Sequence, residues 1–191
     1  MEGEKKLTLT EEWLRRRAVS YASMESKERF VRDCAMRCFD KMEIGTENGE
    51  PMPPYYKENA VLKSRYMLAA LLILYLDVEG LELAEKDDPW LPSEEACDAY
   101  FASFPISQLE RIKKTTQDKE LRDKIYDLLS DYRALEKLLN AECYGLLPAM
   151  NDTLSRFQMM MSAQTTPESV ESLMNSIEEL ERDLNERKAG K

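Results

Sequence analysis

Three aspartates spaced four residues apart form the pattern in this chain that most resembles a catalytic metal site. Asp123, Asp127 and Asp131 would line one face of a helix. Such a face could hold Mg²⁺ in an all-helical phosphohydrolase if a second acidic helix faced it. On that second helix the candidate ligands are Glu178, Glu179 and Glu181. The other interpretation, which we favour, is that these carboxylates are solvated and pair with nearby lysines at i,i+4 spacing.

Other catalytic patterns are missing from the sequence. The chain has no histidine, which excludes Ser-His and Cys-His nucleophile pairs and an HExxH metal helix. It has no GxxxxGK[ST] phosphate-binding loop and no GxGxxG dinucleotide-binding loop. We therefore expect a non-catalytic protein that uses no cofactor.

The four cysteines fit reduced, structural thiols. Cys34 and Cys38 lie four residues apart, whereas Cys97 and Cys143 stand alone. A CxxxC pair within one helix does not readily form a disulfide, and it lacks the second pair that a zinc site needs. This use of cysteine predicts a cytoplasmic protein.

An acidic loop with a central tryptophan is the first candidate surface for a partner. Residues 76–110 carry 10 acidic and 1 basic side chains, which accounts for 9 of the 10 net negative charges. Within this segment Trp90 follows Asp87 and Asp88. These three residues could bind a basic partner, so that the chain would act as an acidic chaperone or inhibitor. Alternatively, Trp90 folds back into the protein while the acids stay solvated. A pI near 4.8 argues against binding nucleic acid.

The most apolar stretch, residues 66–78, predicts a buried central helix. Its 13 residues would span roughly 20 Å, which is short of a hydrocarbon core of about 30 Å. A helix that is apolar on nearly every side packs among other helices, and we place this one at about 57–79. No apolar signal segment precedes it, so we expect neither membrane contact nor export.

Strong helix formers dominate the composition and predict an all-α bundle. Capping signals place helix starts after Thr10, Ser26 and Ser93, with a capping box from Ser107 to Glu110. We expect the first helix to reach about residue 24 and the second about residue 42. The glycines and prolines of residues 43–59 predict an irregular connector.

The C-terminal half carries coiled-coil-like heptads. The first apolar seam consists of Leu121, Ile125, Leu128, Tyr132, Leu135 and Leu139. Gly145 and Pro148 predict a break before a methionine-rich helix, so we divide the chain into a bundle at 1–147 and a helical part at 148–191. The second seam, after Thr166 and Pro167, consists of Val170, Leu173, Ile177, Leu180 and Leu184.

A short heptad helix is marginal in water by itself, so the second seam must find another surface. That surface could be the helix at 121–139 of the same chain, a second copy of the chain or a different protein. The sequence therefore favours a helical interaction or assembly subunit of a larger cellular or viral complex, which contacts its partner or forms a homo-oligomer through helical surfaces.

Overall fold

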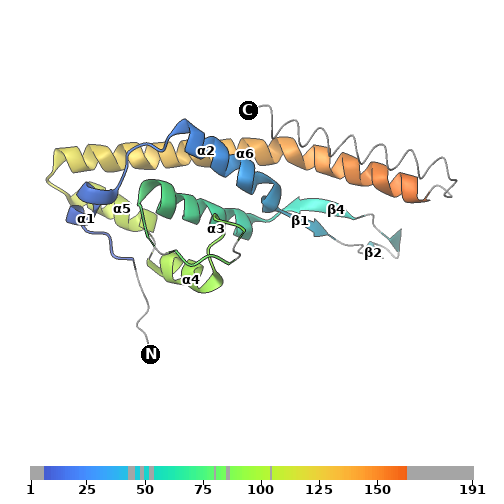
Figure 1. The fold of residues 1–191 in the computed structure, drawn as a ribbon, viewed down its shortest axis with the longest axis horizontal. Helices are drawn as coiled ribbons and strands as arrows, with labels where there is room; N and C mark the ends of the chain where they lie inside the picture. The colour runs from blue at the N-terminus through green and yellow to red at the C-terminus, as the bar shows by residue number, and fades with distance from the viewer. Residues whose placement is uncertain are drawn as a thin grey trace. The chain divides into compact units, whose positions relative to one another are not determined.

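A computed structural model describes residues 7–42, 46–47, 50–51, 54–79, 81–84, 87–103 and 105–162 (Figure 1). These residues are mostly helical, which confirms the predicted helical class, but they also include two small sheets. The helical elements are α1 Glu11–Arg17, α2 Met24–Cys34, η1 Ala35–Cys38, α3 Ala60–Ala70, η2 Leu71–Tyr75, α4 Glu94–Ser103, α5 Pro105–Thr115 and α6 Lys119–Ser162. The strands are β1 Phe39–Met42, β2 Thr46–Glu47, β3 Glu50–Pro51 and β4 Tyr55–Glu58.

The chain divides into two compact units. The first comprises residues 1–40 and 58–146, and the second comprises 41–57 and 147–191. The sequence-based division at 147 did not anticipate that residues 41–57 belong with the later part of the chain.

The core of the first unit is built around α3 and the π-helical turn η2. Asn59 caps α3 by accepting a hydrogen bond from the Leu62 amide at 2.9 Å. The residues from Tyr66 to Leu72 are buried, as are Tyr75 and Leu76, so this helix occupies the core position expected for it. It stops at Tyr75 rather than near residue 79, and the Tyr75 carbonyl accepts a hydrogen bond from Val19 N at 2.9 Å.

The N-terminal helices are shorter than the sequence predicts. Helix α1 ends at Arg17, and α2 begins after Ser23, whose hydroxyl accepts a hydrogen bond from Ser26 N. Between them the chain makes tertiary hydrogen bonds, from Val19 N to η2 and from Ala22 N to Asp131 on α6. Because of these hydrogen bonds, residues 18–23 are not helical, although their helix propensity favours a helix.

The segment that follows α2 also differs from the expectation. Residues 39–42 form strand β1 instead of continuing the helix, and β1 pairs with β4. The stretch expected to be irregular contains β2 and β3, an antiparallel pair with Thr46 opposite Pro51. The Asn48-Gly49 dipeptide between them is the strongest short hairpin signal that a sequence can carry, and it predicts this pairing better than glycine and proline content does.

Helix α6 runs without interruption through Gly145 and Pro148, where the sequence predicted a break. A proline removes one backbone hydrogen bond, but its fixed φ near −65° is compatible with a helix. Strong helix formers on both sides carry the helix past this point. None of the described helices is long and apolar enough to cross a bilayer.

The second unit joins β4 to the later part of α6 through amide side chains. Asn151 accepts a hydrogen bond from Tyr56 N at 2.6 Å and donates one to Tyr56 O at 3.2 Å. Gln158 donates to the carbonyl of Pro54 at 3.1 Å. These contacts satisfy an edge of β4 that would otherwise present free backbone groups.

Candidate docking surface on helices α5 and α6

The apolar seam of α6 faces the core of the first unit. Its members Leu121, Ile125, Leu128, Tyr132, Leu135 and Leu139 are all buried. The alternating steps of four and three therefore predicted correctly which face of the helix is apolar and buried. Because this seam already packs inside the unit, it offers no surface to another helix.

The opposite side of α6 faces solvent and carries two exposed tyrosines. Tyr126 is 64% exposed and Tyr144 is 84% exposed. They are separated by about five full helical turns, so they lie on the same stripe. Between them the stripe contains Ser130, Arg133, Lys137 and Ala141. We call these six residues the outer stripe.

A groove of about 280 Å³ lies where α5 passes the outer stripe. It is lined by Lys113, Tyr126, Leu129, Ser130, Arg133, Ala134 and Lys137. Three of these side chains are cationic and none is acidic. In a chain with a net charge of −10, the groove is a local basic surface.

Glu110 lies beside the groove and binds two of its three cations. Its carboxylate is 2.5 Å from Lys113 Nζ and 3.2 Å from an Arg133 guanidinium nitrogen. The hydrogen bond from Lys113 is the main cause that lowers the pKa of Glu110, with the charges of Lys113 and Arg133 acting in the same direction. Lys137 forms no ion pair with any residue that the structure describes. The groove donors thus already hold one carboxylate and retain a net positive charge.

Local sequence signals position the two helices that form the groove. Pro105 occupies the first position of α5, where a proline needs no hydrogen-bond partner for its nitrogen. Asp118 caps α6 by accepting a hydrogen bond from Leu121 N at 3.1 Å, and it also pairs with Arg15 at 2.8 Å. Buried Leu109 on α5 fixes which side of that helix turns inward.

The three aspartates of the suggested metal face have separate surroundings. Asp131 accepts hydrogen bonds from Lys27 Nζ at 2.5 Å, from the Tyr75 hydroxyl at 3.0 Å and from Ala22 N. Asp127 lies against the hydroxyl of Tyr21, whose pKa it raises. Asp123 is exposed.

Within the described part of the chain, no three Asp, Glu, Cys or His side chains are arranged to hold a metal ion. The possible partner ligands Glu178, Glu179 and Glu181 lie outside the described residues.

The acidic loop is folded inward at two of its three candidate residues. Trp90 is 6% exposed, packs edge-on against Phe30 at 5.1 Å and donates from its indole nitrogen to Asp33 at 3.2 Å. Asp88 is 2% exposed and binds Arg37 at 2.5 Å and the Tyr66 hydroxyl at 2.8 Å.

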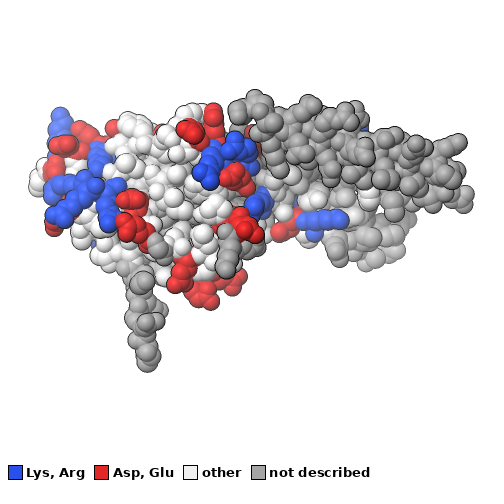
Figure 2. Space-filling view, in the orientation of Figure 1, with Lys and Arg blue, Asp and Glu red and all other residues white. Residues whose placement is uncertain are grey.

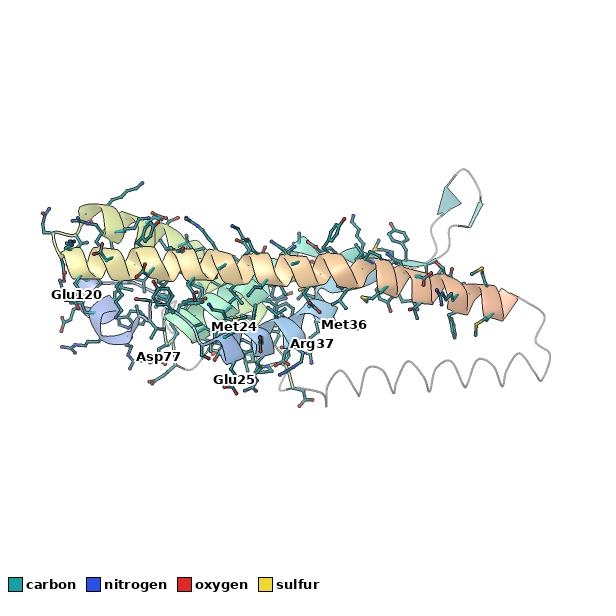
Figure 3. The ribbon with its side chains drawn as sticks, turned by 90° about the horizontal axis from the view of Figure 1, so that it is seen from above. Met24, Glu25, Met36, Arg37, Asp77 and Glu120 are labelled. Carbon is teal, nitrogen blue, oxygen red and sulfur yellow. The ribbon has the colours of Figure 1, made fainter. Side chains whose placement is uncertain are left out.

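The structure therefore places Trp90 in the folded-back arrangement and not in the exposed one. Asp88 is likewise a core ion-pair residue, so a partner would reach these two side chains only if the loop opened. Asp87 is exposed. Arg37, the ion-pair partner of Asp88, belongs to η1, which follows α2 directly. Figure 3 shows Arg37 beside Met36, while Met24 lies at the opposite end of α2.

The second heptad seam, formed by Val170, Leu173, Ile177, Leu180 and Leu184, lies outside the described residues. The groove residues were not among the sequence-based candidates. Their signal was nevertheless present, because Tyr126, Ser130, Arg133 and Lys137 follow steps of four, three and four on the polar side of α6. A seam of this kind is easily overlooked when only apolar residues are counted.

No protein-family model matches the chain, and no curated protein or solved structure shows significant similarity to it. The described residues form a mostly helical protein with an exposed stripe of aromatic and basic side chains.

Proposed function

We propose that this chain is a non-catalytic helical protein that binds another protein chain, as an interaction or assembly subunit of a larger complex. The observation that carries the proposal is the outer stripe of α6. It holds Tyr126 and Tyr144 largely in solvent and sets Arg133 between them. Tyrosine and arginine are, together with tryptophan, the residue types enriched among those that dominate protein–protein binding energy.

The polar networks of the first unit support the proposal because they have structural roles. Asp131 links α6 to α2 through Lys27, and Asp88 links the acidic loop to Arg37. Among the described residues, every buried side-chain nitrogen and oxygen has a hydrogen-bond partner. These groups hold helices together, whereas Tyr126, Arg133 and Tyr144 of the outer stripe are exposed.

The second heptad seam belongs to the same proposal. An amphipathic segment of this length needs an apolar surface to be stable. Because the seam of α6 is buried in its own unit, the Val170–Leu184 seam would have to meet a different surface, in its own chain or in another. It therefore adds a second assembly element to the outer stripe.

A second candidate function is an acidic chaperone or inhibitor that covers a basic partner. The exposed acids Asp87, Glu94 and Glu95 favour it, whereas the burial of Asp88 and Trp90 removes two of its expected contacts. This alternative predicts that reversing the charge of Glu94 and Glu95 abolishes partner binding, while substitutions on the outer stripe leave it unchanged.

Site-specific photo-crosslinking tests the proposed function. A benzophenone amino acid replaces Tyr126 or Tyr144, and a control chain carries it at Val61, which is 73% exposed on α3. We expect adducts with one defined protein peptide from positions 126 and 144, identified by mass spectrometry and reproduced with purified proteins. If neither position gives a protein adduct beyond that of the control, the outer stripe is not a docking surface and the proposal fails.

A further inference from the structure

We infer that the groove between α5 and α6 binds the acidic helix α4 of a second copy of this chain. The inference rests on the proposed function, and it names the partner of the outer stripe. The second copy would contact the groove in a head-to-tail arrangement, with a different surface of each copy in the contact.

The acidic surface of this pairing is α4. Glu94, Glu95 and Asp98 are exposed on it, and its ten residues include no base. Phe101 on the same helix is 39% exposed. Figure 2 shows acidic side chains gathered over α4 on the face in view. An exposed aromatic ring beside exposed acids matches the composition of the groove, where Tyr126 lies beside cations.

The spacing of charges on the two helices also matches. Glu94 and Asp98 are four residues apart, as are Arg133 and Lys137, so each pair occupies one helical turn. With the two helices antiparallel, Glu94 lies opposite Lys137 and Asp98 opposite Arg133. In this register Phe101 lies beyond Asp98 and Tyr126 lies beyond Arg133 at the same end of the contact. The two aromatic residues are therefore brought toward each other.

Glu110 shows that the groove binds a carboxylate. Its carboxylate forms ion pairs with Lys113 at 2.5 Å and with Arg133 at 3.2 Å, while Lys137 has no ion pair within the described residues. A carboxylate from α4 would form an ion pair with Lys137, and a second one would compete with Glu110 for Arg133. Loss of the Glu110 charge should therefore strengthen the contact.

The two surfaces lie apart within one copy. In Figure 1, α3 lies between α6 and α4. Seen from above, α5 runs along one side of α6, and Met24 and Glu25 of α2 lie on the other side (Figure 3). A contact between α4 and the groove thus joins two copies, and a head-to-tail contact of this type extends into a ring or a filament.

The net charge of −10 on each copy does not prevent this contact at physiological salt. The Debye length is then about 8 Å, so distant charges are screened while charges within the interface still attract. Association should weaken at about 1 M salt, where the Debye length is about 3 Å.

Light scattering of the full chain over a concentration series tests the inference. We expect the mass to rise above the 22.2 kDa of one chain near 0.15 M salt and to return toward it at about 1 M. Lys137→Glu or Asp98→Lys alone should weaken association by about tenfold or more. Glu110→Gln should strengthen it. Lys114→Glu is the matched control, because Lys114 is exposed on α5 and does not line the groove.

Charge exchange separates a true contact from misfolding. A mixture of the Lys137→Glu and Asp98→Lys chains should associate more strongly than either chain alone, because each supplies the surface that the other lacks. A single-chain mass at every concentration would overturn the inference, as would an equal loss from Lys114→Glu or no recovery in the mixture. If the chain has a single-chain mass but position 126 crosslinks to a different protein, the partner is not a second copy of this chain. The inference then fails, while the proposed function stands.

Discussion

Lys27 and Asp131 form an ion pair of 2.5 Å that joins α2 to α6, with side chains only 11% and 10% exposed. The same carboxylate also accepts hydrogen bonds from the Tyr75 hydroxyl and from Ala22 N, both at 3.0 Å. One aspartate of the suggested metal face is thus a junction between three parts of the core.

Replacing Asp131 should destabilise the fold strongly. Asp131→Ala leaves the part-buried Lys27 ammonium and the Tyr75 hydroxyl without this partner. Because breaking a fully buried pair costs about 3 to 5 kcal/mol, we expect a loss at the lower end of that range, about 3 kcal/mol. Asp123→Ala, on the same helix but exposed, should change the free energy of unfolding by about 0.5 kcal/mol or less. Urea unfolding of both variants measures the difference, and similar losses from the two would contradict the assigned role.

The cap of α6 should give a pH-dependent contribution to stability. The hydrogen bond from Leu121 N, followed by that from Arg15, lowers the pKa of Asp118 below its ordinary value. A depressed pKa in the folded state stabilises the protein above the unfolded-state value of about 3.9, and this stabilisation is lost as the pH falls through the folded-state pKa. The stability difference between the wild type and Asp118→Asn should therefore be constant near pH 7 and close in acid. A difference that grew in acid would show that the sign is wrong.

The four thiols should react slowly in the native protein. Cys34, Cys38, Cys97 and Cys143 are free and buried, which hinders access to all four. Burial raises the pKa of the Cys34 and Cys97 thiols, whereas a hydrogen bond with Cys38 lowers the pKa of Cys143, which should be the fastest of the four to react. Because the thiolate is the reactive form, a thiol-specific dye should label the native chain far more slowly than the chain in urea. Rapid native labelling of one thiol, located by mass spectrometry, would show that its surroundings open readily.

Divalent metal should leave the melting temperature unchanged. A ligand that binds only the folded state must raise the midpoint of thermal unfolding. Two of the three aspartates already bind side chains of residues 21–27, so we expect no shift with millimolar Mg²⁺ or Mn²⁺. A rise that disappears in Asp127→Asn would instead support the helical hydrolase suggested by the spacing of these acids.

Truncation distinguishes the two assembly elements. A chain that stops at Gln164 keeps α4, α5 and the outer stripe but lacks the Val170–Leu184 seam. If the groove binds α4 of a second copy, light scattering should show that the truncated chain still associates and still responds to Lys137→Glu. Circular dichroism should confirm that it remains folded. Loss of association in a folded truncated chain would assign assembly to the seam.

Spacing in the sequence was sufficient to predict the helical class and the buried face of α6 between Leu121 and Leu139. The steps of four and three from Leu121 to Leu139 identify the inner side of α6, and Thr10 and Ser93 mark helix starts by their hydroxyls. These features are local, because a helix period and a cap are set by residues within one or two turns.

The sequence did not predict where tertiary contacts override local preference. The chain leaves the helical path at residues 18–23 because Val19 and Ala22 bond to η2 and α6, and it continues as a helix through Pro148 despite a proline. The first outcome depends on hydrogen-bond partners that are distant in sequence. The second depends on the strong helix formers on both sides of Pro148, which outweigh the effect of one proline.

The candidate docking surface also has one part that follows from local sequence and another that depends on tertiary packing. The sequence by itself determined that α6 has an apolar side and a polar side, since helix geometry fixes which residues share a face. Only the tertiary structure decided that Trp90 and Asp88 turn inward, and that Lys113 of α5 meets Arg133 and Lys137 of α6 in one groove. Burial and charge clustering depend on which helices pack together, and that packing is a property of the whole chain.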